Sequence, residues 1–132
     1  MAKDINSRKK IFLIDDDELH LLAAEICLKD EYDIHKAKSG EEALKSLCKN
    51  DFIPDLIMLD IIMPEMDGWE VFRKIKGISI LKNIPILFLT SVDGEEEKEK
   101  ARELGAVDYI TKPLETVLLN STIKEIFRIR GK

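Results

Sequence analysis

The sequence predicts a doubly wound α/β fold built on one parallel sheet of five strands. Five short β-prone runs each precede a longer stretch with helical periodicity. The first, third and fourth runs are apolar almost throughout, which is typical of parallel strands that helices cover on both faces. A chain of 132 residues has the length of one domain, since a single core usually organises about 100 to 200 residues. We therefore expect five β-α units in one domain.

The elements follow in order along the chain. The expected strands are residues 11–14, 32–36, 56–59, 86–89 and 107–110. Two helical stripes are expected to face the sheet, one formed by Leu19, Leu22, Ala23 and Ile26 and the other by Leu119, Ile123, Ile126 and Phe127. Ser39 and Glu42 form a capping-box pattern that predicts a helix start, and Gly105 predicts a left-handed C-cap.

Composition and charge exclude several classes of function. Lys plus Arg number 21 against 26 Asp plus Glu, and this net charge of -5 gives no support to nucleic-acid binding. The longest apolar runs fall far short of the roughly 18 residues of a membrane helix, and no secretory signal is present. We expect a cytoplasmic protein. Two cysteines, Cys27 and Cys48, exclude a disulfide framework and are expected to be small buried side chains.

Polar side chains follow four of the predicted strands. They are Asp15, Asp16 and Asp17 after the first strand, Asp60 after the third, Thr90 and Ser91 after the fourth, and Thr111, Lys112 and Pro113 after the fifth. Because ligands of such sheets bind beyond the carboxyl ends of the strands, these groups form the candidate site. Neighbouring carboxylates repel each other unless a cation neutralises them, and Mg²⁺ is the natural candidate.

The set of side chains suits the handling of a phosphoryl group. Carboxylates, Mg²⁺, a lysine and a hydroxyl together neutralise and position phosphoryl oxygens. Taken one at a time, the Asp run could be a helix N-cap and Lys-Pro could be a turn. His20 and His35 belong to no metal-spaced cluster, so we treat His20 as a surface residue near the rim of the acidic pocket.

These motifs resemble the receiver domain of two-component response regulators, in its stand-alone single-domain form. The resemblance is carried by Asp15-Asp16 after IFLI, DIIMPEMDG at 60–68, Thr90-Ser91 after ILFL and GAVDYITKP at 105–113. It implies the (βα)5 flavodoxin-like receiver fold. We expect a tail at residues 1–8, a receiver domain at 9–130 and no attached output domain.

The resemblance implies a role for each matching residue. Asp60 would be the phosphoacceptor for a partner sensor histidine kinase or phosphotransfer protein. Asp16 would bind Mg²⁺ directly and Asp15 through water, with Asp60 and the backbone carbonyl of Ile62 completing the metal site. Asp17 could also reach this site.

The remaining motif residues would position and report the phosphoryl group. Lys112 would pair with its oxygens, the Thr90 hydroxyl would hydrogen-bond to them, and Tyr109 would switch between outward and inward positions. We expect a cis peptide before Pro113, and a positive φ or a tight approach at Gly68.

Phosphorylation is expected to change a surface made by the fourth helix, the fifth strand and the fifth helix. The fourth helix, near residues 95–104, has almost no apolar face and should be loosely docked. Leu118 and Ile129 lie off the core stripe of the last helix, and could serve a downstream partner or a homodimer. Ile62 and Val92, at positions that set the lifetime of the phosphoryl group in this family, are both apolar and predict slow dephosphorylation.

Three alternatives stay open from the sequence. An Asp-nucleophile phosphatase would share the strand-end carboxylate, but such enzymes usually place a second Asp where this chain has Ile62. The chain could also be a receiver from a larger hybrid kinase or a phosphorelay shuttle. A receiver that binds without being phosphorylated is the third, and the complete acceptor set argues against it. We expect no catalysis beyond the phosphorylation and slow dephosphorylation of the chain itself.

Overall fold

The computed structural model describes residues 8–49 and 52–130, and contains one parallel sheet of five strands. The strands are β1 (Lys10–Ile14), β2 (Asp33–Ala37), β3 (Leu56–Leu59), β4 (Ile86–Thr90) and β5 (Asp108–Thr111), in the spatial order β2-β1-β3-β4-β5. All four pairings are parallel. The predicted fold class is confirmed, and no strand boundary differs from the predicted one by more than one residue.

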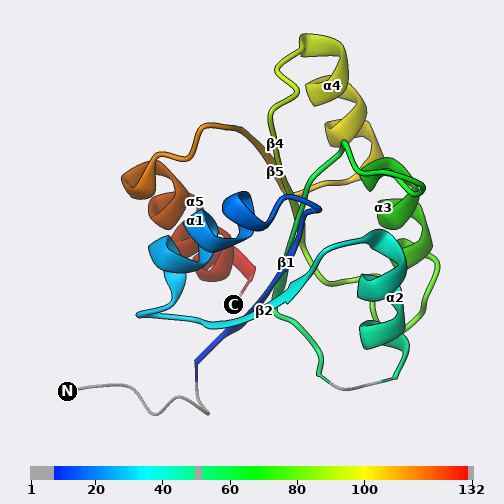
Figure 1. Ribbon diagram of the computed structural model, residues 1–132, viewed down its shortest axis with the longest axis horizontal. Helices are drawn as coiled ribbons and strands as arrows, with labels where there is room; N and C mark the ends of the chain where they lie inside the picture. The colour runs from blue at the N-terminus through cyan, green and yellow to red at the C-terminus, as the bar shows by residue number, and fades with distance from the viewer. Residues whose placement is uncertain (1–7, 50–51, 131–132) are drawn as a thin grey trace.

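Five helices cover the two faces of this sheet. They are α1 (Glu18–Leu28), α2 (Gly40–Cys48), α3 (Gly68–Lys76), α4 (Glu95–Leu104) and α5 (Thr116–Arg130). Helices α1 and α5 lie together on one face, while α2, α3 and α4 lie on the other (Figure 1). The predicted tail at residues 1–8 falls outside the described residues apart from Arg8.

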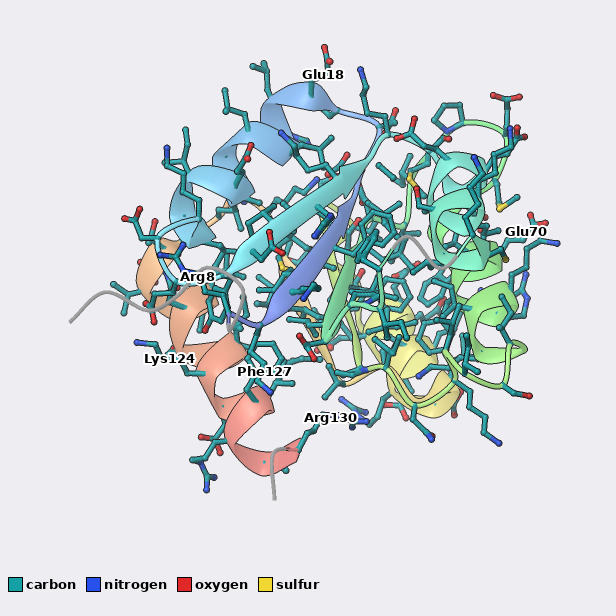
Figure 2. All side chains as sticks on the ribbon, turned by 90° about the horizontal axis from the view of Figure 1, so that it is seen from below. Arg8, Glu18, Glu70, Lys124, Phe127 and Arg130 are labelled. Atoms are coloured by element: carbon teal, nitrogen blue, oxygen red, sulfur yellow. The ribbon has the colours of Figure 1, made fainter. Side chains whose placement is uncertain are left out.

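Each face of the sheet contributes to its own apolar core. Side chains of β1 alternate between the two cores: Ile11 and Leu13 face α1 and α5, and Phe12 and Ile14 face the other helices. The side chains fill the space between the sheet and each helical layer (Figure 2). Because β1, β3 and β4 are buried at nearly every position, their carboxyl ends are held rigidly.

The predicted helix signals are present in the structure. The Ser39 hydroxyl accepts a hydrogen bond from the Glu42 backbone N–H at 3.0 Å, and Gly105 ends α4 with a φ of 100°. The stripe on α5 is also confirmed, since Leu119, Ile123 and Ile126 are buried and Phe127 packs against their core.

The predicted inward face of α1 is wrong. Leu19, Leu22 and Ile26 are 75%, 49% and 57% exposed, and Ala23 is also exposed. The helix instead buries the residues two positions further along each turn, which are Leu21, Ala24 and Leu28. Both sets have the i, i+3, i+7 spacing of a sheet-facing stripe, so periodicity alone does not distinguish them.

The cysteines also depart in part from expectation. Cys48, the last residue of α2, is exposed, and Cys27 is half-buried. The Cys27 Sγ lies 3.3 Å from the Thr116 hydroxyl oxygen, which joins the end of α1 to the start of α5. Among the described residues, no helix is both long and apolar enough to cross a membrane.

Candidate functional site

Two carboxylates and one hydroxyl are buried at the carboxyl ends of neighbouring strands. Asp15 follows β1, Asp60 follows β3 and Thr90 ends β4, and their exposed fractions are 6%, 7% and 0%. Strands β1 and β3 are paired in parallel, and the Asp60 backbone N–H donates to the Ile14 carbonyl at 3.0 Å. The sheet register therefore places the two carboxylates beside one another.

Lys112 reaches this pair from the end of β5. Its Nζ donates to Asp15 Oδ2 at 2.5 Å and to Asp60 Oδ2 at 3.3 Å. The side chains of Lys112, Asp15 and Asp60 are only 8%, 9% and 8% exposed. The expected cis peptide between Lys112 and Pro113 is present.

The charge of Asp15 is only partly compensated. Burial raises the pKa of the Asp15 carboxyl, against the lowering effects of the Lys112 ammonium and of the Asp17 backbone N–H. The nearby Asp60 carboxylate raises this pKa further. Two buried carboxylates face one ammonium group, so the pocket favours an additional cation.

Asp60 is held tightly by the chain that follows it. Its Oδ1 accepts from the Ile61 backbone N–H at 2.7 Å, which leaves Oδ2 directed toward Lys112. A Cβ added at Gly68 would lie 2.2 Å from the Asp60 carbonyl oxygen. The expected tight approach at Gly68 is confirmed, and glycine is required there by space rather than by φ.

The three consecutive acidic residues have different surroundings. Asp17 caps α1, because its Oδ1 accepts from the backbone N–H groups of Leu19 and His20 at 2.9 and 3.4 Å. Both bonds lower the pKa of the Asp17 carboxyl, and the bond from the Leu19 N–H has the larger effect. Asp16 is exposed and lies outside the group of ligand atoms that converge on the pocket.

His20 lies at the rim of the pocket, as expected, but the sequence did not predict that it offers a ligand atom there. It lies in the first turn of α1, and Lys112 Nζ is 2.7 Å from His20 Nδ1. Within the described residues, Asp15, His20 and Asp60 each offer a metal-ligand atom, and these atoms lie within 4.8 Å of one another. A histidine three residues after an N-capping Asp gives no metal spacing, so only the folded arrangement identifies it.

The residues expected to report the phosphoryl group lie on the β4 and β5 side. The Val92 backbone N–H donates to the Thr90 hydroxyl at 3.3 Å, and the Tyr109 hydroxyl donates to the Val92 carbonyl at 2.5 Å. Burial, with the nearby charges of Glu97, Asp93 and Asp60, raises the pKa of Tyr109 to about 12. The Tyr109 hydroxyl is thus bonded to the loop that follows Thr90.

The chemistry of the pocket fits a divalent cation. Asp15 and Asp60 supply the hard carboxylate oxygens that Mg²⁺ prefers, and the raised pKa of Asp15 reflects a charge that burial penalises. Ile62, whose backbone carbonyl is the further expected ligand, lies two residues after Asp60 and is 61% exposed.

Helix α4 is weakly attached, as its sequence predicted. Ala101 is its one buried residue, and Lys100 Nζ lies 4.4 Å from the centre of the Trp69 ring. Trp69 belongs to the core beneath α3 and α4, as expected. Leu118 and Ile129 of α5 are 52% and 58% exposed.

Comparison with known proteins agrees with this fold. The sequence matches the response regulator receiver domain family over residues 11–124. It is 40% identical over 121 residues to the alkaline phosphatase synthesis transcriptional regulatory protein PhoP of Bacillus subtilis, covering 91% of this chain and 49% of PhoP. It spans about a quarter, 26% and 27%, of the length of other curated relatives.

Solved structures lead to the same family. The chemotaxis protein CheY4 of Vibrio cholerae superposes with a TM-score of 0.82 at 30% identity, covering 90% of this chain and 98% of CheY4. The phosphorylated cyanobacterial phytochrome response regulator RcpA superposes with a TM-score of 0.78 at 30% identity, covering 92% of each chain. The chain therefore belongs to the response regulator receiver domains of two-component signalling.

Proposed function

We propose that the chain is a phosphorylation-dependent switch in which Asp60 accepts a phosphoryl group from the phosphohistidine of a partner kinase. The observation that carries this proposal is the convergence of Asp60, Asp15 and Lys112. Lys112 Nζ lies 2.5 Å from Asp15 Oδ2 and 3.3 Å from Asp60 Oδ2, and all three side chains are nearly buried. RcpA, a relative at 30% identity, was solved in a phosphorylated form.

The proposed transfer is a simple displacement at phosphorus. An Asp60 carboxylate oxygen forms the new P–O bond, the P–N bond to the donor imidazole breaks, and the imidazole leaves with the electron pair. The Ile61 N–H holds Asp60 Oδ1 at 2.7 Å, so Oδ2, which has only the longer 3.3 Å contact with Lys112, would be the nucleophile. Lys112 then pairs with the phosphoryl oxygens.

Asp15, Asp16, Asp60 and the Ile62 carbonyl would hold Mg²⁺ in this reaction. The bound ion would neutralise charge on the transferring oxygens and offset the repulsion between the carboxylates. Asp15 and Asp60 are already at the pocket, and Asp16 is the next residue along the chain. Because Asp16 is exposed, its side chain is free to turn toward a bound ion.

Phosphorylation would be transmitted through Thr90 and Tyr109. A phosphoryl group on Asp60 attracts the Thr90 hydroxyl, which now accepts from the Val92 N–H. Moving this hydroxyl changes the loop to which the Tyr109 hydroxyl is bonded. The surface formed by α4, β5 and α5 would then change its affinity for a downstream protein.

Mass spectrometry tests this proposal directly. The chain is incubated with acetyl phosphate and Mg²⁺, and the wild type is compared with Asp60→Asn. We expect one acid-labile phosphoryl adduct on the wild type, dependent on Mg²⁺ and located on the peptide containing Asp60. An unmodified wild-type chain, or an equal adduct on Asp60→Asn, would show the proposal to be wrong.

The acyl phosphate is expected to persist once formed. Ile62 is 61% exposed beside the acceptor and Val92 is half-buried, and neither side chain can hydrogen-bond to an attacking water. Ile62→Gln should therefore shorten the lifetime about tenfold or more, because a positioned polar group typically contributes at least that to proton transfer. The decay is followed by loss of the adduct after rapid removal of acetyl phosphate, and a wild-type half-life of seconds contradicts the expectation.

The lengths of the relatives support a second candidate. The chain matches only part of PhoP and about a quarter of two other curated relatives, so this receiver could act as one module of a larger response regulator. In that case phosphorylation would change contacts to a covalently linked partner domain. Affinity capture on the phosphorylated chain separates the two candidates. Capture of a separate protein supports the independent switch, and capture of none supports a covalently linked partner domain.

A further inference from the structure

His20 adds an imidazole nitrogen to a pocket otherwise lined by carboxylates and an ammonium group. Its Nδ1 lies 3.6 Å from Asp15 Oδ2. Asp15, His20 and Asp60 together offer three ligand atoms within 4.8 Å of one another. The His20 side chain is 44% exposed, so its ring can adjust without disturbing the core.

The Lys112 ammonium marks the point toward which these three ligands are directed. Its Nζ is 2.5 Å from Asp15 Oδ2, 2.7 Å from His20 Nδ1 and 3.3 Å from Asp60 Oδ2. A single cationic group therefore already contacts all three ligand atoms. A metal ion bound by the same atoms would replace this ammonium.

The identity of the ligands selects the class of metal. Mg²⁺ is a hard ion that binds oxygen and gains little from an imidazole. Borderline ions such as Zn²⁺ and Co²⁺ bind imidazole strongly. Zn²⁺ also accepts Asp and Glu oxygens, and with three protein ligands it keeps an open position for water. We propose that Asp15, His20 and Asp60 form a Zn²⁺-class site, with His20 as the residue that favours Zn²⁺ over Mg²⁺.

Occupation of this site would inhibit the switch. An ion held by Asp60 Oδ2 ties up the oxygen that would accept the phosphoryl group, so Zn²⁺ would compete with phosphorylation. This consequence rests on the proposed function, whereas binding of the metal does not.

Isothermal titration calorimetry of the full chain with Zn²⁺ and with Mg²⁺ tests the site. The variant is His20→Ala, and the matched control is His35→Ala, whose ring stacks on Phe52 at 4.0 Å and contacts Asp33 in β2. We expect His20→Ala to weaken Zn²⁺ binding at least about tenfold, since even partners outside the ligand set matter by that much. Its Mg²⁺ affinity should stay within about twofold, because Mg²⁺ prefers oxygen ligands.

A second variant tests the competition with the ammonium group. Lys112→Met removes the cation that contacts all three ligand atoms, so its Zn²⁺ affinity should exceed that of the wild type. In NMR spectra, Co²⁺ should broaden the His20 ring signals at lower concentrations than those of His35. Cys48→Ser should bind Zn²⁺ as the wild type does, which excludes binding at this exposed thiol.

The inference is overturned if His20→Ala leaves the affinity for Zn²⁺ unchanged, or if it weakens Zn²⁺ and Mg²⁺ equally. Phosphorylation by acetyl phosphate in Mg²⁺ alone is measured in parallel. An Asp60 adduct with a Zn²⁺ affinity indifferent to His20 refutes the metal site and leaves the switch intact. Zn²⁺ binding through His20 without any Asp60 adduct refutes the switch and leaves the metal site.

Discussion

Asp15 is a pocket residue whose ionised form is destabilised by burial. It is 6% exposed, and burial raises the pKa of its carboxyl despite the bond from Lys112. Ionised Asp15 therefore lowers the stability of the native state relative to a neutral side chain of similar shape. Such a carboxylate is retained at a stability cost, which indicates a use in binding a cation or a phosphoryl group.

Asp15→Asn should stabilise the protein in the absence of metal. Because native Asp15 holds its proton more tightly than the unfolded chain, wild-type stability falls as the pH rises from 3.8 through the raised native pKa. Asparagine does not titrate, so the stability of Asp15→Asn does not fall in this way. At neutral pH in EDTA we expect a free energy of unfolding about 1 kcal/mol above that of the wild type, because Asp60 still pairs with Lys112 and no buried charge is left uncompensated.

Urea denaturation at several pH values measures this difference. The advantage of Asp15→Asn should shrink below pH 3.8, where both states of the wild type are protonated. Mg²⁺ should also reduce it by stabilising the wild type. A wild type that is as stable as Asp15→Asn at neutral pH in EDTA contradicts the argument.

At this scale the sequence predicted the strand-end residues, and it placed the helical residue His20 near the rim of the pocket without predicting its contacts there. Asp15, Asp60, Thr90 and Lys112 follow parallel strands, so topology alone brings them to one edge. His20 is on a helix, and its place depends on the angle at which α1 leaves Asp17. That angle is set by the capping bonds to Leu19 and His20 and by burial of the inward face of α1, and local sequence spacing does not contain it.

At the scale of elements, the β3–α3 connection fixes the position of Asp60, the proposed phosphoacceptor. The Gly68 N–H donates to the Ile61 carbonyl at 2.7 Å, and Asp67 caps α3 by accepting from the Glu70 N–H at 3.0 Å. The start of α3 is therefore pressed against the backbone of Asp60 and Ile61. Because the β3–α3 side of the site is packed rigidly, we expect movement on the β4 and β5 side.

Gly68→Ala should displace Asp60 and lower both stability and phosphorylation. The new Cβ would meet backbone atoms at 2.2 to 2.9 Å, and overpacking of this kind typically costs about 1 to 3 kcal/mol. Gly77→Ala is the matched control, because its nearest contacts are at 3.5 Å and its φ is -83°. Urea denaturation and the rate of adduct formation measure the two effects, and equal results for the two variants would contradict the argument.

Helix α1 has two apolar faces, and only one of them contacts the sheet. The inward face, Leu21, Ala24 and Leu28, packs against α5 and the strands. The outward face, Leu19, Leu22 and Ile26, is exposed and begins one residue before His20. The sequence shows that α1 has apolar residues on two faces. It does not predict which face is buried, because tertiary packing decides that. An exposed apolar face beside the pocket of the proposed phosphoacceptor is suited to contact a protein donor.

Leu22→Glu should separate phosphorylation by a small molecule from phosphorylation by a protein. Leu22 is 49% exposed, so the free energy of unfolding should change by no more than about 0.5 kcal/mol. Phosphorylation by acetyl phosphate should be unchanged. Transfer from a histidine kinase that phosphorylates the wild type should slow about tenfold, as expected for loss of an apolar interface anchor.

Ile80→Glu is the matched control for Leu22→Glu. Ile80 is 61% exposed, and it precedes β4, at the edge of the sheet opposite the pocket. Its phosphorylation by both donors should match that of the wild type. If Leu22→Glu and Ile80→Glu slow the kinase reaction equally, the outward face of α1 is not the contact surface.

At the scale of the whole molecule, an aromatic series runs from α3 through β4 to β5, beside the strand ends that carry the proposed phosphoacceptor site. The Trp69 ring lies 4.9 Å from Phe88 on β4, and Phe88 lies 6.1 Å from Tyr109 on β5. Lys100 Nζ of α4 lies over the Trp69 ring, 4.4 Å from its centre. Because α4 buries little else than Ala101, a movement of Thr90 and Tyr109 costs little when it shifts this helix.

Trp69 should therefore report phosphorylation by its fluorescence. It is the one tryptophan of the chain, and movement of α4 would withdraw the Lys100 ammonium from its ring and change the polarity around it. We expect acetyl phosphate with Mg²⁺ to change Trp69 emission in the wild type, and not in Asp60→Asn. Lys100→Ala should lose about 0.5 to 1 kcal/mol of stability, the usual contribution of an exposed cation–π contact, together with most of the emission change. An emission change that persists in full in Lys100→Ala would show that α4 stays in place while β4 and β5 move beneath it.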